Sequence, residues 1–499
     1  MLISAIREEA AASKSSRTDK NAEGSVIEST SRHDAQLTWA KLPIQKRLEV
    51  LQHARFAMSR MTDAFSEAIP SHLCRTPAET RVAEILPLLA ACRFLEQRAA
   101  KILKIRPLGS RGRPFFLARC ISEIQRVPHG VVLILGPANY PLLLPGVQAL
   151  QALAAGNAVV LKPGHGGGPI AKLFAEALYA AGLPRSLLEV MDDSIEAAED
   201  ALRSSVDKVI FTGSAQTART VLRVCAEKII PCVIEASGCD AVVVLPSADL
   251  KRVVRAITFG MRLNGSATCM APRRLLLLGA SEDRKKMLVG MLSTAFYECG
   301  PAYLSETLRA NLDEMLHEAE RFGARVHGSI SEEQRPILVT EVKPGMRLAQ
   351  ADLFAPVLSV IDVSSEAEVL AAQEACPFAL TASVFGDEVE AKRMASALNV
   401  GNVLINDIIV STVDPRIPFG GRKESGYGAT RGTEGLLEMT VAKVVSLQRS
   451  KSVRSYEGTG DQHRELFDGV ILALHSQTLR QRGQGLAKAL RAAMRLRQK

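Results

Sequence analysis

The stretch VVLILGPANYPLLLPGVQALQALAAGNAVVL, residues 131–161, contains no charged side chain. Its length would let it cross a bilayer as a helix, but three prolines and two asparagines interrupt it. It divides more naturally into a strand at residues 131–135, a loop, a helix at residues 142–155 and a strand at residues 158–161. Buried parallel strands are near-continuous apolar runs, so we interpret the stretch as the beginning of a parallel sheet.

The alternation of strands and helices continues toward the C-terminus. The hydrophobic pattern predicts further strands at residues 188–191, 208–211 and 232–235, with helices between them. Strands that alternate with helices form parallel sheets. The pattern restarts after Ser237, so we expect a second α/β domain. Its strands are expected at residues 241–245, 275–278, 358–361, 381–385 and 403–406. Helical spacing occurs at residues 37–60, 77–104, 250–261, 282–294 and 388–397.

The composition is that of a globular protein with a basic tail. The chain has 499 residues, of which 47% are hydrophobic and 23% charged, and its net charge is +9. These fractions exclude a disordered or fibrous chain. Residues 451–499 hold ten Lys or Arg and four Asp or Glu, so they account for +6 of the charge. The remaining residues are nearly neutral, which argues against a body that binds nucleic acid.

The cysteines and histidines show no metal-binding pattern. The nine cysteines are scattered and include no CxxC pair, and the chain has no HExxH motif. We therefore expect reduced thiols and no metal site. No secretory signal is evident in residues 1–35, so we expect a cytoplasmic protein.

Five motifs follow one another in a fixed order. Asn139 lies in GPANYP, Lys162 in VVLKP, Glu235 in VIEASG and Cys269 in NGSATCMAPRR, and Asn406 is followed by PFGGRKESG at residues 418–426. In this order, and with 34 residues between the glutamate and the cysteine, the chain resembles the aldehyde dehydrogenase superfamily over residues 36–449. No single motif is specific, but the ordered set is.

The resemblance implies an α/β fold with a Rossmann-like cofactor domain, an α/β catalytic domain and a small β oligomerisation arm. The expected division of the chain is a polar N-terminal extension at 1–35, an NAD(P)-binding domain at 36–236 with the arm at 115–127, a catalytic domain at 237–430, an oligomerisation strand region at 431–450 and a basic C-terminal tail at 451–499.

The resemblance also implies a mechanism. Cys269 would attack the aldehyde carbonyl as a thiolate, hydride would pass to NAD or NADP, and water would hydrolyse the resulting thioester to a carboxylic acid. An unperturbed thiol is only a few per cent ionised at pH 7, so a nearby base or dipole is required. Glu235 would be the general base for water. The side-chain amide of Asn139 and the backbone N–H of Cys269 would form the oxyanion hole.

Cofactor residues follow from the same resemblance. Lys162 would bind the adenine-ribose hydroxyls, Gly213 and Ser214 would lie by the pyrophosphate, and Asp352 and Phe354 would hold the nicotinamide half. The chain departs from the usual pattern mainly in this region. The departures are His165 in place of an acidic residue, Ala218, Ala236, Ser237, Ala267, Asp352 and Ala355. Losing a carboxylate near a 2′-phosphate removes repulsion, so we hypothesise that NADP is accepted and even preferred.

Retention of Glu235 favours a free acid as product over transfer of the acyl group to CoA, and an acyl-CoA-linked reductase is a minor alternative. The expected substrate tunnel is mostly apolar, which suggests an aliphatic or aromatic aldehyde. It would be lined by Tyr140, Leu143, Val147, Thr268 and Met270. The basic pair Arg273 and Arg274 is expected to have structural partners.

Three questions stay open. The chain could be an impaired relative that serves as a scaffold, in place of an active enzyme. Residues 479–499, with seven basic residues and no acid, could be a solvated tail or a basic amphipathic helix on an anionic membrane or an acidic partner. The resemblance implies a homodimer or homotetramer, assembled through residues 115–127 and 440–449.

Overall fold

The computed structural model describes residues 22–450, 456 and 458–497, which form two compact units. The larger unit holds the described residues up to Ile105 and Gln125–Lys443, and the smaller holds Arg106–Ile124 and the residues from Val444 onward. None of the helices in the described part of the chain is long and apolar enough to span a membrane. Of the expected extension, residues 1–21 lie outside the described residues, and helix α2 (Ala22–Lys41) takes up the remainder.

The first sheet of the larger unit has six strands in the order β19-β7-β6-β3-β4-β5. Neighbouring strands are parallel, except that β19 runs antiparallel to β7. The strand bounds are Val131–Leu135 (β3), Ala158–Lys162 (β4), Leu188–Val190 (β5), Lys208–Gly213 (β6), Cys232–Ala236 (β7) and Gly426–Tyr427 (β19). The five strands predicted here are confirmed, and β19, which comes from far along the chain, was not predicted.

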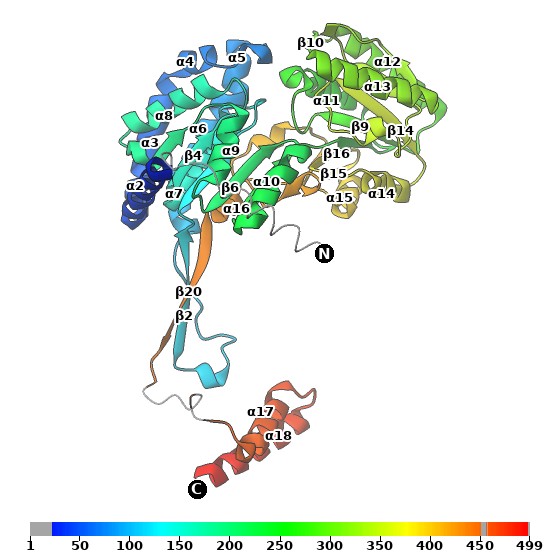
Figure 1. Cartoon of the computed structure of the whole chain (residues 1–499). Coiled ribbons are helices and arrows are strands. Elements are labelled where there is room, and N and C mark those ends of the chain that lie inside the picture. The colour runs from blue at the N-terminus through cyan, green and yellow to red at the C-terminus, as the bar shows by residue number, and fades with distance from the viewer. Residues whose placement is uncertain (1–21, 451–455, 457, 498–499) are drawn as a thin grey trace, which may run out of the picture. The chain divides into compact units, whose positions relative to one another are not determined.

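Helices surround this sheet (Figure 1). Their bounds are Ile44–Arg60 (α3), Thr62–Glu67 (α4), Pro77–Thr80 (α5), Leu86–Ile102 (α6), Leu143–Ala155 (α7), Gly168–Ala180 (α8), Ile195–Arg203 (α9), Ala215–Lys228 (α10) and Gly432–Glu438 (α16). Every residue of α7 is buried, because this helix packs between the sheet and α3 and α6. The helix predicted at residues 37–60 is two helices, since Pro43 lacks a backbone N–H and ends α2.

The second sheet has seven strands in the order β11-β13-β14-β9-β8-β16-β17, all parallel except β11. Their bounds are Asp240–Val244 (β8), Pro272–Leu278 (β9), Arg325–His327 (β11), Ile337–Thr340 (β13), Val357–Val363 (β14), Thr381–Phe385 (β16) and Asn402–Ile405 (β17). Five of these strands were predicted, and β11 and β13 were not. The helices are Leu250–Arg262 (α11), Glu282–Glu298 (α12), Glu306–Arg321 (α13), Glu366–Ala375 (α14) and Glu388–Ala397 (α15).

Two short ladders complete the larger unit. They pair β10 (Ala302–Tyr303) with β12 (Glu333–Gln334), and β15 (Phe378–Ala379) with β18 (Arg422–Lys423). A three-stranded sheet has the order β1-β2-β20, from Arg106–Pro107 (β1), Cys120–Pro128 (β2) and Thr440–Gln448 (β20). An extended arm was predicted at residues 115–127, and β2 confirms its extended part.

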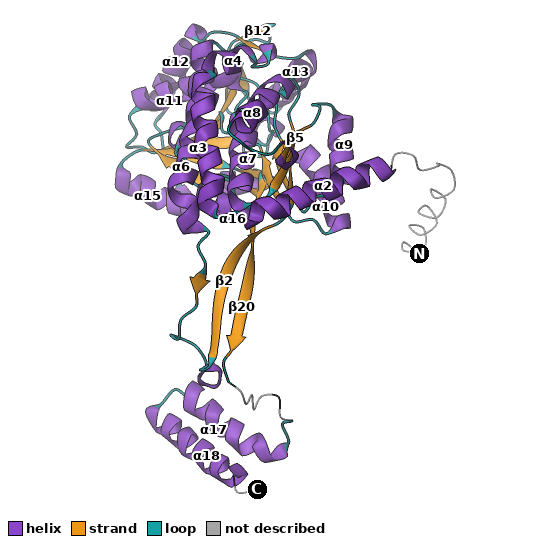
Figure 2. Cartoon of the chain, turned by 90° about the vertical axis from the view of Figure 1, so that its left-hand side faces the viewer, coloured by secondary structure: helices purple, strands orange, loops and turns teal. Residues whose placement is uncertain are grey.

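The C-terminal residues of the smaller unit form a helical hairpin. Figures 1 and 2 show α17 (Arg464–His475) and α18 (Leu479–Arg497) side by side. The helices approach closely, because a Cβ at Gly469 would overlap the backbone of Ala489. Ion pairs also join them, with Lys488 to Asp468 at 3.0 Å and Arg495 to Glu465 at 3.1 Å. For residues 479–499 the sequence left a solvated tail and an amphipathic helix open, and the structure has a helix at Leu479–Arg497.

Candidate active site

One cavity of about 810 Å³ in the larger unit is lined by both Cys269 and Glu235. Cys269 lies in the turn between a short helix at Leu263–Ser266 and strand β9, and Glu235 lies near the end of β7. Phe354 and Arg431 line the same cavity. The structure thus brings together the nucleophile and the base that the sequence predicted, although they come from different parts of the chain.

The backbone before Cys269 is tightly wound. Asn264, Gly265 and Ser266 all have positive φ, at 54°, 58° and 66°. A positive φ is costly for residues other than glycine, so neighbouring groups must hold this turn. The buried guanidinium of Arg273 does so by donating to Ser266 Oγ at 2.7 Å and to the Ser266 carbonyl at 2.6 Å.

The second buried arginine, Arg274, also has structural partners. Its guanidinium donates to the carbonyl oxygens of Cys239 at 2.8 Å and Ala372 at 3.0 Å. The expectation that Arg273 and Arg274 pair structurally is therefore confirmed.

Glu235 is held by one of its two carboxylate oxygens. Its Oε2 accepts a hydrogen bond of 2.6 Å from Thr430 Oγ1. Its Oε1 is buried and has no hydrogen-bond partner among the described residues. Burial raises the pKa of this carboxyl, and the nearby Arg431 and Thr430 oppose the increase. A carboxylate oxygen without a partner is able to accept a proton.

Burial also raises the pKa of the Cys269 thiol, and the neighbouring charge of Glu235 raises it further. The resting thiol is therefore neutral near pH 7, and its reaction requires transfer of its proton to a base. Arg431 acts in the opposite direction, since its positive charge lowers the pKa of the thiol.

Asn139 is tied to the turn that carries Cys269. Its Nδ2 donates to the Ala267 carbonyl at 3.0 Å, and Arg75 Nη2 donates to the Asn139 carbonyl at 2.6 Å. Tyr140 lines the cavity, but Asn139 is not among the residues that do. The oxyanion role of Asn139 stays a prediction.

An ion pair and several hydrogen bonds around Arg75, which the sequence did not reveal, hold the loops that carry Asn139 and Cys269. Arg75 Nη1 forms an ion pair of 2.5 Å with the fully buried Glu84, and Arg75 Nε donates to Asn264 Oδ1 at 2.8 Å. Glu84 also accepts from the backbone N–H of Leu143 at 2.6 Å. Arg75 therefore links the loops of Asn139 and Cys269.

Of the five residues expected to line the tunnel, Tyr140, Leu143 and Met270 line the cavity. The expectation is wrong for Val147 and Thr268, which are buried behind the wall. Thr268 Oγ1 forms a 2.9 Å hydrogen bond with the Tyr140 hydroxyl, so it contributes by fixing a wall residue.

Asn406 has a structural role. Its Oδ1 accepts from the Gly386 backbone N–H at 3.0 Å, and its Nδ2 donates to the Gly386 carbonyl at 2.8 Å. These bonds occupy both ends of its amide.

The residues expected on the adenine side lie at or just after the carboxyl ends of strands in the first sheet, the usual position of dinucleotide sites in open α/β sheets. Asp352 and Phe354 lie in the loop before β14 of the second sheet. Lys162 ends β4, Gly213 ends β6, and Ser214 caps α10 by accepting from Thr217 N–H at 3.2 Å. The half-buried Lys162 ammonium has no hydrogen-bond partner within the described residues. An ammonium without a hydrogen bond and a helix N-terminus at which Ser214 occupies the N–H of Thr217 fit a nucleotide with a pyrophosphate.

The surroundings of Lys162 change the charge argument drawn from His165. Burial lowers the pKa of the Lys162 ammonium, while the negative charges of Asp193 and Asp192 raise it. Asp193 Oδ2 accepts from the Gly166 backbone N–H at 2.5 Å, next to His165. Carboxylates from the loop after β5 therefore lie near His165, the position at which the sequence lacks the expected acidic residue. Their negative charge makes a preference for NADP less well supported.

Two departures from the family pattern contact each other. Ser237 Oγ donates a hydrogen bond to Asp352 Oδ2. Burial raises the pKa of Asp352, and this hydrogen bond and Arg273 lower it. The carboxylate expected near the nicotinamide ribose thus has a partner within the protein.

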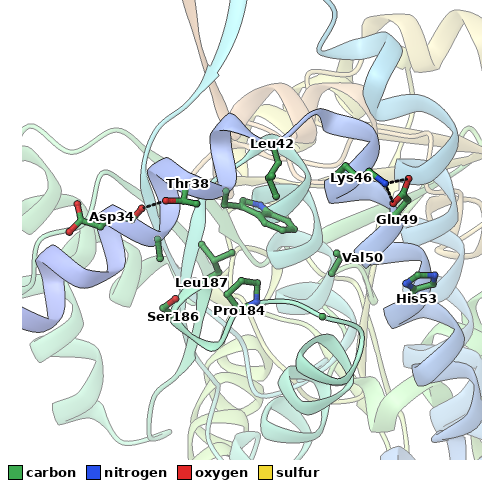
Figure 3. Close-up of a pocket in the computed structure, with 13 residues that line it drawn as sticks. Asp34, Thr38, Leu42, Lys46, Glu49, Val50, His53, Pro184, Ser186 and Leu187 are labelled. Atoms are coloured by element: carbon green, nitrogen blue, oxygen red, sulfur yellow. Dashed lines mark hydrogen bonds and ion pairs between the residues drawn. The ribbon is translucent and has the colours of Figure 1, made fainter.

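A second cavity, of about 710 Å³, lies between α2, α3 and residues 182–187 (Figure 3). Its walls include Leu42, Val50, Pro184 and Leu187. It contains none of the predicted site residues.

Comparisons with known proteins agree with this geometry. A sequence model described as the Aldehyde dehydrogenase family matches residues 4–445. The chain is 30% identical over 479 residues to a 4,4'-diapolycopene aldehyde oxidase of Methylomonas sp, covering 93% of this chain and 89% of the relative. It is 27% identical to a putative NADP(+) succinate-semialdehyde dehydrogenase of Mycolicibacterium smegmatis, covering 83% of each chain.

A solved structure of Mycobacterium tuberculosis aldehyde dehydrogenase complexed with NAD+ aligns with a TM-score of 0.75 at 26% identity, covering 83% of this chain and 88% of that one. With the family model spanning most of the chain, these similarities show both fold and family. The chain belongs to the aldehyde dehydrogenase family and is an enzyme that oxidises aldehydes with NAD or NADP.

Proposed function

We propose that this enzyme oxidises long, apolar aldehydes to carboxylic acids, with Cys269 as the nucleophile and Glu235 as the base. The observation that carries the proposal is the single large cavity that both side chains line. Most of its other walls are apolar. They include Leu73, Val82, Leu144, Phe259, Leu263, Leu304, Leu308, Ile409, Val410 and Val413. Apolar walls bind apolar chains through the hydrophobic effect.

The steps follow from the two reacting groups. The sulfur of Cys269 bonds to the aldehyde carbon while the thiol proton passes to the carbonyl oxygen, which gives a thiohemiacetal. A bound cofactor would supply the hydride acceptor, and with loss of the hydroxyl proton to solvent the carbon attached to Cys269 would become a thioester. Glu235 then takes a proton from water through its free Oε1, the water oxygen bonds to the acyl carbon, the carbon–sulfur bond breaks, and the proton on Glu235 passes to the departing thiolate. The products are a carboxylic acid and the free thiol.

The proposed cofactor-binding residues are Lys162, His165, Gly213 and Ser214 for the adenine half, and Asp352 and Phe354 for the nicotinamide half. The free Lys162 ammonium and the cap at Ser214 support these assignments. The scaffold alternative is not favoured, because Cys269 and Glu235 lie together in one cavity.

A charged substrate is less well suited to the site. Succinate semialdehyde, named in one relative, carries a carboxylate that needs an unpaired cation. Three arginines line the cavity. Arg75 is paired with Glu84, Arg262 is exposed, and the charge of Arg431 is opposed by that of Glu235. The diapolycopene aldehyde named in the other relative is a long polyene, which the apolar walls suit better.

The test is kcat/KM for straight-chain aldehydes of increasing length, together with a polyene aldehyde and succinate semialdehyde, with NAD and with NADP. We expect kcat/KM to rise about fourfold per methylene, because each buried methylene contributes about 0.8 kcal/mol. The rise should stop when the cavity is full. A higher kcat/KM for succinate semialdehyde than for decanal would contradict the proposal.

We also propose a homodimer or homotetramer assembled through β20. This strand is at the edge of its sheet, and four of its apolar residues are exposed, Val441, Val444, Val445 and Leu447. An apolar edge strand is a template for pairing with another chain. Light scattering should give a mass of two or four chains, and Val445→Lys should lower it. A single-chain mass for the unmodified protein would rule out this assembly.

The proposed location is the cytoplasm. All nine cysteines are free thiols, which is typical of proteins in a reducing compartment.

A further inference from the structure

Arg431 is a buried cation in the active-site wall to which neither the sequence motifs nor the mechanism above assigns a task. It is 8% exposed and lines the cavity that holds Cys269 and Glu235. Its guanidinium lies over the Phe419 ring at 4.5 Å, and its Nη1 donates to the Thr412 carbonyl at 2.8 Å. These contacts fix the position of its charge.

One donor of Arg431 has no use among the described residues. Its Nε is buried and has no partner among the described residues. The same is true of Oε1 of Glu235, the carboxylate that Thr430, the preceding residue, holds by its other oxygen. A buried donor and a buried acceptor of opposite charge are thus left open in one cavity, which is costly unless they serve each other or a reacting group.

The backbone of Arg431 supports a specific role. Its φ is +62°, a conformation that costs a residue with a Cβ about 1 kcal/mol or more. The next residue, Gly432, also has positive φ. This strained turn at the start of α16 directs the chain so that Thr430 and Arg431 both reach the end of β7.

The charged groups around Cys269 and Glu235 indicate what a cation at this position would do. Glu235, Asp240 and Asp352 raise the pKa of the thiol, and Arg431 lowers it. The buried Arg273 also interacts with Cys269, but its guanidinium donates to Ser266 and to the Ala355 carbonyl. Around Glu235, Arg431 is again the opposing charge. Without this charge the pKa of both groups would rise further, so that Glu235 would hold its proton to higher pH and the thiolate of Cys269 would be harder to form.

We propose that Arg431 is a positioning residue whose guanidinium keeps Glu235 ionised as a base and favours the thiolate of Cys269. The inference rests on the roles proposed for these two residues. Lysine at this position would preserve the charge, whereas methionine would preserve only the length of the side chain.

The experiment measures alkylation of Cys269 by iodoacetamide between pH 7 and 9, without cofactor, and follows the Cys269 peptide by mass spectrometry. It is done in a Glu235→Gln background, so that a change in the charge of Glu235 does not offset the effect on the thiol. Adding Arg431→Met should slow alkylation about tenfold at each pH, since losing an adjacent opposite charge raises a thiol pKa by about one unit. Arg431→Lys should leave the rate within about twofold of the background.

The matched control is Arg47→Met. Arg47 is also buried, and its guanidinium donates to the carbonyls of Ala154, Ala40 and Leu42, but it does not line the cavity. It should leave the alkylation rate unchanged. If Arg431→Met does not fold, Arg431→Gln, which keeps a donor for Thr412 and loses the charge, carries the same expectation.

A second measurement reports on Glu235 in the otherwise unmodified enzyme. The rise of kcat with pH on the acid side should move to higher pH in Arg431→Met, because the carboxyl would stay protonated longer. Unchanged alkylation in the neutral Arg431 variants, or an equal slowing in Arg47→Met, would overturn the proposal. Failure of Cys269 to react in the Glu235→Gln background would overturn the nucleophile assignment itself, and the two failures are thus distinct.

Discussion

Replacing Cys269 with alanine should lower kcat/KM for aldehyde oxidation by at least about 10⁴-fold, because removing a nucleophile abolishes the covalent route. The measurement is absorbance at 340 nm with the best aldehyde found in the length series. Cofactor binding by the variant, followed by fluorescence, should persist, because Cys269 lies at the aldehyde side of the site.

The matched control is Cys92→Ala. Cys92 is buried in α6 and lies outside the residues that line the cavity. It should retain most of the activity. If Cys269→Ala kept more than a few per cent of the unmodified rate, another group would have to be the nucleophile.

Replacing Glu235 with glutamine should separate the two halves of the reaction. Glutamine keeps an oxygen for the Thr430 hydroxyl, but it cannot take a proton from water. Hydrolysis of the thioester should therefore slow by about 10² to 10⁴-fold, the usual contribution of a general base. Stopped-flow absorbance should show a first turnover of reduced cofactor equal to the number of active sites, followed by a slow steady state.

Hydroxylamine provides the control for this variant. It is a stronger nucleophile than water and needs no base to attack a thioester, so it should restore much of the steady-state rate. A first turnover slowed as much as the steady state would show instead that Glu235 acts before the thioester forms.

The parallel sheets were predictable because their cause is local. A strand buried on both faces has to be apolar along its length, and the runs at β3 and β4 show this directly. The short strand β19 gave no such signal. It pairs with β7 across almost 200 positions of chain, and only the fold shows that Gly426 lies opposite Glu235.

The sequence motifs pointed to Cys269 and Glu235 as site residues, but they did not indicate the residues that surround these two side chains. Thr430 and Arg431 belong to no local pattern that indicates catalysis. Thr430 is linked to Glu235 by a hydrogen bond, and Arg431 by the effect of its charge on the same carboxyl. Likewise, Asp193 reaches the loop of His165 from the loop after β5. Positions along the chain do not indicate which charges lie together in space, so the hypothesis of an NADP preference left Asp193 out.

The error at Val147 has a simple physical cause. Val147 was expected in the tunnel because it lies close to Asn139 in the sequence, but α7 is buried on all sides, so closeness in the sequence did not identify the face toward the cavity.

For the tail, the sequence left a solvated segment and an amphipathic helix open. Small residues such as Gly469 and Gly485 allow two helices to meet closely.

The pairing of β19 with β7 also bears on the order in which the protein is made. Glu235 leaves the ribosome long before Thr430, which follows it by 195 residues. At usual synthesis rates this interval is roughly 10 to 40 s. During that time the outer edge of β7 has no partner strand, and an open apolar edge is a site for aggregation. The contacts that hold Glu235 are therefore complete only when nearly all of the larger unit has been translated. Until then, chaperones or early packing have to protect the open edge of β7.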